Sequence, residues 1–182
     1  MEHDFVIQIR NVLPAAICDG LINLFETSEH KQRLDKGGYP NWTNLFVGHH
    51  HPEVHKDLSD LILTVAREYS DVMEPYGRHF NTVSPDLEGC NIKKYVGGSN
   101  DVYKRHADVS DLACSRRFLA MVFYLNDDFT GGETVFYPDR VVTPMKGSVL
   151  IFPPYWMFPH EGMPVITGNK YIMSTYCLWP KT

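Results

Sequence analysis

A histidine and an aspartate stand two residues apart in the stretch KRHADVSD, at His106 and Asp108. If this stretch is a strand, residues i and i+2 point to the same face, so an imidazole and a carboxylate lie side by side. Such a pair can supply two adjacent ligands to one metal ion. A half-exposed strand with an ordinary polar face has the same pattern, so a metal site requires a third ligand from elsewhere in the chain.

A third candidate ligand lies far along the chain, in the stretch FPPYWMFPHEGMPVITGNKY. His160 comes after an apolar run, and Lys170 follows it ten residues later. Alone, each has an ordinary structural explanation, as a hydrogen-bonded histidine and a solvated lysine. With His106 and Asp108, however, His160 completes the two imidazoles and one carboxylate of a non-haem Fe(II) centre with open coordination positions. Because a buried ammonium is costly without an anion, Lys170 beside such a centre indicates an anionic ligand, for example a dicarboxylate that chelates iron through its other end.

The second half of the chain must position these residues, and it reads as a series of strands. Short runs rich in β-branched and aromatic residues alternate with Gly, Pro and Asn-Asp turns, with no helix between them. This order favours a sandwich or jelly roll over a parallel sheet. The predicted fold is α+β and mainly β, with a double-stranded β-helix (jelly-roll) core over residues 89–182 flanked by N-terminal helices. The predicted strands lie within CNIKKYV, FLAMVFYLN, ETVFYP, GSVLIFP and KYIMSTYCLW.

The first part of the chain, residues 1–88, is expected to be helical and loop-rich. A strand is predicted over Phe5 to Ile9, one helix from Pro14, and a second helix after Asp57 that ends before Pro75. The segment from Asp35 to Glu53 has no clear period and is interpreted as a loop, either mobile or a lid over the site. The apolar stripes behind the helix predictions are Ile17, Leu21, Leu24 and Phe25, and Leu58, Leu61, Ile62, Val65, Tyr69 and Val72.

Composition limits the class of protein. A chain of 182 residues is the size of one domain, so residues 1–182 are expected to form a single unit. The formal net charge of −5 disfavours a nucleic-acid partner. The chain has no run of apolar residues long enough to cross a membrane and no leader-like start, so no membrane partner and a cytoplasmic location are expected. The four cysteines form no C-x-x-C pair and are expected to be buried, reduced thiols. The sequence specifies no oligomeric state.

A second possible metal site is the stretch HHHPEVH, residues 49–55, which is the densest histidine cluster in the chain. Adjacent histidines in a loop can bind zinc or nickel adventitiously. They cannot all face one ion, and no helical H-E-x-x-H pattern is present. This cluster, and an interaction module with no metal at all, remain as alternatives.

From about Cys90 to Trp179 the chain resembles the 2-oxoglutarate and Fe(II)-dependent oxygenases, specifically the prolyl 4-hydroxylase-like group. The family pattern is H-x-D, a distant His, and Lys or Arg about ten residues on. Here His106, Asp108, His160 and Lys170 supply it. Where the family typically has Trp a few residues after the lysine, this chain has Tyr176 and then Trp179, a departure on the substrate side. Further similar segments are KYVGGSNDVYKRHAD, VFYLND, GGETVFY, PMKGSVLIFP and HEGMPVITGNKY.

This resemblance implies Fe(II) held by His106, Asp108 and His160, with 2-oxoglutarate and O2 as cosubstrates and ascorbate as a reductant. The reaction implied is hydroxylation of an unactivated C–H bond, with release of succinate and CO2. Lys170 and Tyr124 would hold the distal carboxylate of 2-oxoglutarate, and Tyr95 would be a further polar group in the pocket. Each tyrosine has the alternative of being a core aromatic with its hydroxyl hydrogen-bonded.

For the substrate, the resemblance favours a prolyl residue in a peptide or protein, held by aromatic surfaces. The alternatives are a free amino acid or small metabolite, because substrate choice lies in loops, and a non-catalytic, cupin-like metal-binding domain. A cupin-like domain has no need of Lys170 beside His160, so this lysine discriminates between the two classes. The aromatic residues proposed to contact substrate are Tyr39, Trp42, Tyr103 and Trp156.

Overall fold

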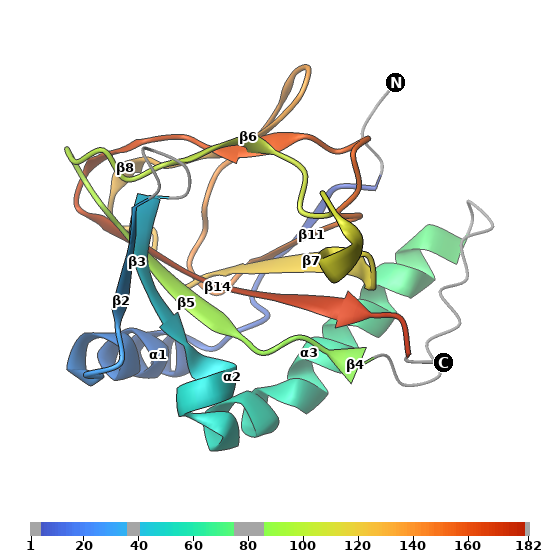
Figure 1. The fold of residues 1–182 in the computed structure, drawn as a ribbon, viewed down its shortest axis with the longest axis horizontal. Helices are drawn as coiled ribbons and strands as arrows, with labels where there is room; N and C mark the ends of the chain where they lie inside the picture. Colours follow the sequence, from blue (N-terminus) through green and yellow to red (C-terminus); the bar gives the residue numbers. More distant parts are fainter. Residues whose placement is uncertain (1–4, 36–40, 75–85, 181–182) are drawn as a thin grey trace.

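The computed structural model describes residues 5–35, 41–74 and 86–180. Within these ranges, strands and all three α-helices make up the part up to residue 74, and the chain continues from residue 86 almost entirely as strands (Figure 1). No helix among the described residues is long and apolar enough to cross a membrane. The helices are α1 (Ala15–Thr27), α2 (Val47–His50) and α3 (Pro52–Met73), with a short 3-10 turn at Leu112–Cys114.

The strands form a large sheet in the order β1-β11-β7-β14-β5-β3-β2 and a small sheet in the order β10-β9-β12-β6. All of the pairings between the described strands are antiparallel, β4 pairs with the C-terminal end of β14, and β13 pairs with β8. Two antiparallel sheets with crossed connections confirm the predicted jelly roll. The strands are β1 (Ile7–Ile9), β2 (Gln32–Asp35), β3 (Asn41–Phe46), β4 (Asp86–Leu87), β5 (Asn91–Val96), β6 (Tyr103–His106), β7 (Arg117–Tyr124), β8 (Thr130–Gly131), β9 (Thr134–Phe136), β10 (Arg140–Val142), β11 (Val149–Phe152), β12 (His160–Gly162), β13 (Val165–Thr167) and β14 (Asn169–Leu178).

The large sheet has an apolar core on each face, because side chains alternate along its strands. On β7, Met121 and Phe123 face a core that the helices α1 and α3 cover, whereas Ala120 and Tyr124 face the space between the two sheets. Figure 1 shows the helices below the large sheet and β6 above it. The candidate ligands His106 and His160 lie on β6 and β12 of the small sheet and face this enclosed space, whereas Lys170 faces it from β14 of the large sheet.

Several local expectations were wrong in detail. The segment Asp35–Glu53 is not a structureless loop, because it contains β3, α2 and the first turn of α3, although residues 36–40 lie outside the described part. The second helix begins at Pro52, before the expected N-cap Asp57, since proline is favoured at a first helical position. All four cysteines are free, but Cys114 is partly exposed and only the other three are buried.

Candidate metal centre

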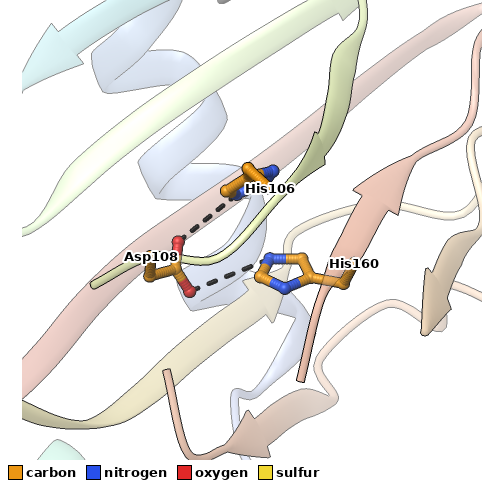
Figure 2. Close-up of side chains that lie close together, drawn as sticks. All are labelled: His106, Asp108 and His160. Carbon is orange, nitrogen blue, oxygen red and sulfur yellow. Dashed lines mark ion pairs between the residues drawn. The ribbon is translucent and has the colours of Figure 1, made fainter. Parts of the chain in front are cut away.

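His106, Asp108 and His160 converge between the two sheets (Figure 2). His106 ends β6 and His160 begins β12, and the two residues are direct partners in the antiparallel register of these strands. Nε2 of His106 lies 3.4 Å from Oδ1 of Asp108, and Nε2 of His160 lies 3.8 Å from Oδ2. Each imidazole therefore faces a different oxygen of one carboxylate, and the three side chains are nearly buried, at 4%, 5% and 8% exposed.

The backbone fixes how both imidazoles are presented. Nδ1 of His106 lies 2.8 Å from the carbonyl oxygen of Lys104, and Nδ1 of His160 lies 3.1 Å from that of Phe158. A carbonyl oxygen only accepts hydrogen bonds, so each Nδ1 carries the proton and donates. In the neutral ring this leaves the lone pair on Nε2, the nitrogen that faces the shared centre.

The charges of the cluster suit a cation. Burial raises the pKa of Asp108, but the neighbouring imidazoles of His160 and His106 and the hydroxyl of Tyr176 lower it to about 2. The carboxylate is therefore ionised at neutral pH. Burial lowers the pKa of His160, which favours the neutral ring. An anionic carboxylate and two neutral imidazoles are the ionisation states in which these groups bind a metal.

This donor set fits the iron that the sequence predicts. One nitrogen or oxygen atom from each of the three residues lies within 4.8 Å of the other two. Two imidazoles and one carboxylate on a single face are the ligand set of a non-haem Fe(II) site that keeps coordination positions for other ligands. Within the described part of the chain this is the one group of three or more His, Cys, Asp or Glu residues arranged in this way.

Lys170 lines the same pocket as the three candidate metal ligands and brings a buried cation to it. It lies on the inner face of β14, opposite Tyr95 on β5, and is 4% exposed. Its Nζ donates to the carbonyl oxygen of Gly132 and lies 5.7 Å and 5.5 Å from the ring centroids of Tyr95 and Tyr124. Burial lowers the pKa of Lys170 to about 8. Lys170 thus supplies a buried cation inside the pocket, as the sequence predicts.

The two predicted pocket tyrosines differ in role. Tyr95 lines the pocket directly. Tyr124 is completely buried, and its hydroxyl shares a 2.8 Å hydrogen bond with Oγ1 of Thr134, which does line the pocket. Burial raises the pKa of both tyrosines, so both hydroxyls stay protonated at neutral pH. Tyr124 is therefore a buried aromatic residue that lies behind Thr134 and does not itself line the pocket.

The proposed substrate aromatics do not all reach the pocket. Tyr103 lines it and stacks on His106 with ring centroids 3.5 Å apart. Trp42 is buried behind this wall, against Tyr103 and Tyr95, and Trp156 is 78% exposed and outside the lining. Tyr39 lies outside the described residues. The pocket lining comprises Lys93, Tyr95, Tyr103, His106, Asp108, Ala120, Met121, Val122, Thr134, Phe152, His160, Gly162, Met163, Lys170, Ile172, Ser174 and Tyr176.

Sequence reasoning missed four polar residues of this pocket, Lys93, Thr134, Ser174 and Tyr176. The hydroxyl of Tyr176 donates to Oδ1 of Asp108 at 2.9 Å. Lys93 faces the pocket from β5, and burial lowers its pKa to about 8. A signal was present for Tyr176, which follows Lys170 by six residues and therefore shares its face of the strand. Lys93 precedes Tyr95 by two residues and therefore shares its face of the strand, which was the corresponding signal.

The alternative sites lack comparable geometry. In the 49–55 cluster, His50 stacks on His30 at a centroid distance of 4.3 Å and His51 pairs with Glu53, but these side chains do not bring three ligand atoms together. The nearby arginines are already paired outside the pocket. Arg117 makes two hydrogen bonds to Glu88, of 2.6 and 2.7 Å. Neither the histidine cluster nor Arg117 replaces the metal triad or Lys170.

A family model and a curated protein of known name are similar to this chain in sequence. The family model described as the 2OG-Fe(II) oxygenase superfamily matches residues 90–178, the part of the chain that contains the three candidate ligands and Lys170. A protein of Acanthamoeba polyphaga mimivirus named "Putative prolyl 4-hydroxylase" is 29% identical over an alignment of 130 residues, and the match covers 59% of this chain and 50% of that protein. The chain thus spans about half the length of this relative.

Solved structures share the whole fold. A Trichoplax adhaerens prolyl hydroxylase, in complex with a peptide fragment of hypoxia inducible factor, aligns over 96% of this chain and 84% of its own, with a TM-score of 0.76 and 19% identity. A Pseudomonas putida prolyl-4-hydroxylase aligns over 97% and 94%, with a TM-score of 0.73 and 18% identity. The viral collagen prolyl hydroxylase of Paramecium Bursaria Chlorella virus-1, as its 2OG complex, aligns over 94% of this chain and 94% of its own, with a TM-score of 0.67 and 24% identity.

Proposed function

We propose that this chain is a member of the 2OG-Fe(II) oxygenase superfamily, whose family model matches residues 90–178, and that it hydroxylates a prolyl residue of a peptide or protein. The observation that carries the proposal is the convergence of His106, Asp108 and His160 in a pocket that also holds the buried cation Lys170. The family match favours an enzyme over the cupin-like binding domain. The prolyl substrate is supported by the names of the similar proteins.

His106, Asp108 and His160 would hold Fe(II) through two Nε2 atoms and one carboxylate. When bound with 2-oxoglutarate and O2, this iron supplies the oxidation in which one oxygen atom enters a C–H bond and the other enters succinate, as CO2 leaves. The hydrogen bonds from Nδ1 of both histidines to backbone carbonyls hold the rings in place. Asp108 would give the iron a carboxylate ligand, which favours hydroxylation over halogenation.

The remaining polar groups would orient the cosubstrate. Lys170 would pair with the distal carboxylate of 2-oxoglutarate, since a charge-assisted hydrogen bond stabilises an otherwise costly buried ammonium. The hydroxyl of Tyr95 and that of Thr134 would be the further donors on this side. Apolar neighbours such as Ile172 and Phe152 exclude water around the oxidising centre.

The substrate would enter along the side of the pocket formed by Tyr103, Met163 and Tyr176. A peptide or protein is the leading class, and a free amino acid or small metabolite is the alternative within the same reaction. Ascorbate is proposed as a reductant that keeps the iron in its Fe(II) state.

Anaerobic titration tests the proposal. Fe(II) and 2-oxoglutarate are added to the protein, and the visible charge-transfer absorption of the chelate is followed, with His106→Ala as the control variant. A band that is absent from the variant supports the site. Prolyl peptides are then screened under O2 for a mass gain of one oxygen and for stoichiometric succinate. Well-folded protein that shows neither a band nor succinate would exclude this function.

A further inference from the structure

The pocket contains a second lysine that the proposed reaction does not use. Lys93 lies on the inner face of β5, opposite Ile172 of β14, and lines the pocket together with the candidate metal ligands. Its Nζ stands 5.1 Å from the ring centroid of Trp42 and 5.8 Å from that of Tyr103. Among the residues that the structure describes, none accepts a hydrogen bond from this ammonium or forms an ion pair with it.

Lys93 and Lys170 occupy different aromatic surroundings. Lys170 donates to the backbone of Gly132 and lies between Tyr95 and Tyr124. A dicarboxylate that chelates the metal at one end and meets Lys170 at the other has both of its charges matched. Lys93 then remains a cation without an anion, so its partner must come from another molecule.

The carboxylates near Lys93 are already engaged. Asp108 faces both imidazoles and accepts from Tyr176, and Glu88 is held by two hydrogen bonds from Arg117. The rings beside Lys93 attract a cation but carry no negative charge to neutralise it. A partly buried ammonium in this position is therefore costly until an anion binds.

Two more donors beside Lys93 are unused. Asn44 on β3 is the direct partner of Lys93 in the β3–β5 register, so both side chains leave the same face of the sheet. The side-chain nitrogens of Asn44 and Trp42, Nδ2 and Nε1, are buried and have no hydrogen-bond partner among the described residues. Buried donors without acceptors are rare in proteins and call for an explanation. Asn44 and Trp42 lie behind the pocket lining, so Lys93 is the group of the three that faces the pocket and lacks an anionic partner there.

We propose that Lys93 binds a carboxylate of the primary substrate, so that this enzyme selects an anionic substrate. This inference rests on the function proposed above. The carboxylate belongs either to an acidic side chain next to the target residue of a peptide or to the α-carboxylate of a small amino-acid substrate. Both sources offer the same group, and matched compounds distinguish them.

The test measures binding to the protein already loaded anaerobically with Fe(II) and 2-oxoglutarate, by calorimetry and by the change in the visible band. One pair of probes is N-acetylproline and N-acetylprolinamide. The other is an acetylated Glu-Pro amide and its Gln-Pro counterpart. A charge-assisted hydrogen bond predicts that the acid of one pair binds about tenfold to a hundredfold more tightly than its neutral partner. The pair in which the acid binds more tightly than its neutral partner identifies the source of the carboxylate.

Lys93→Met should remove this preference while the affinity for 2-oxoglutarate stays within about twofold, and Lys93→Arg should keep much of it. Lys94→Met is the matched control, because Lys94 points to the other face of β5 and pairs with Glu26 at 2.8 Å. Equal binding of acid and amide in both pairs would overturn the inference. So would a loss of 2-oxoglutarate affinity in Lys93→Met as large as in Lys170→Met, because Lys93 would then serve the cosubstrate. Failure of the proposed function itself is distinct, since the band is then absent from the unaltered protein.

Discussion

The hydroxyl of Tyr176 donates a hydrogen bond to Oδ1 of Asp108, at 2.9 Å, across 68 residues of sequence. One face of the Tyr176 ring contacts Arg117, whose guanidinium carbon lies 4.0 Å from the ring centroid. Arg117 also donates to the backbone oxygen of Asp108. A candidate metal ligand is thus oriented by a tyrosine that stands where the prolyl hydroxylase-like pattern typically has tryptophan.

Tyr176→Phe should weaken Fe(II) binding by roughly tenfold, because outer hydrogen bonds to ligating carboxylates typically contribute factors of about 10–100 to metal affinity. Anaerobic Fe(II) titration measures the effect. Tyr171→Phe is the matched control, since Tyr171 lies on the opposite face of the same strand and donates to Glu26. Unchanged iron affinity in Tyr176→Phe would show that the hydrogen bond does not orient the ligand.

Asp108→Ala should abolish coupled turnover. The substitution removes the anionic ligand and leaves two neutral imidazoles, whose combined affinity for Fe(II) is far lower. Succinate formation and substrate mass are measured together in the presence of excess Fe(II). Succinate production at the unaltered rate in this variant would refute the assignment of the triad.

Lys170→Met should raise the dissociation constant for 2-oxoglutarate by about tenfold to a hundredfold while Fe(II) binding is retained, because one charge-assisted pair is lost. The anaerobic chelate band reports both affinities. Arg116→Met serves as the control, since Arg116 is bound to Asp86 and the carbonyl oxygen of Trp179 outside the pocket. An unaltered 2-oxoglutarate titration in Lys170→Met would mean that another cation holds the cosubstrate.

The affinity for 2-oxoglutarate should fall as the pH rises through about 8, the value to which burial lowers the pKa of Lys170. Below this pH the lysine carries the charge that pairs with the carboxylate. Above it, binding must first protonate the amine, so the dissociation constant rises by up to about tenfold per pH unit. Titrations at several pH values measure this. In Lys170→Met the affinity should be weak and nearly independent of pH over the same range, and an equal slope in both proteins would contradict the prediction.

Gly48→Ala should destabilise the fold by about 1–3 kcal/mol. A Cβ at this position would lie 2.5 Å from Cα of Gly89, so the backbones of α2 and the segment before β5 must separate. Gly20→Ala provides the contrast. Gly20 is exposed within α1, and an added Cβ meets nothing within 4 Å. That change should stabilise the fold by roughly 0.5–1 kcal/mol through helix propensity. Urea denaturation measures both, and equal effects would contradict the packing argument.

The sequence alone determined the succession of strands in the second half of the chain and the chemical types of the candidate ligands. FLAMVFYLN is predicted to be a strand, and the alternation of a strand puts Ala120 and Tyr124 on one face, as the structure has them, because strand periodicity is a local property of the chain. The types and spacing of His106, Asp108, His160 and Lys170 predicted two imidazoles, a carboxylate and a cation, and the structure brings them to one pocket. The jelly roll followed from the succession of strands, and the structure and its neighbours confirm it.

Only the tertiary structure decided which side chains share the site. The pairing of β6 with β12, which sets His160 opposite His106, joins residues 54 positions apart and is a property of sheet register rather than local pattern. In NIKKYV the two adjacent lysines look alike, yet alternation turns Lys93 into the pocket and Lys94 toward Glu26. Asn44 and its neighbour Trp42 lie in a segment that has no clear period, because β3 is buried on both of its faces and so shows no alternation of polar and apolar residues.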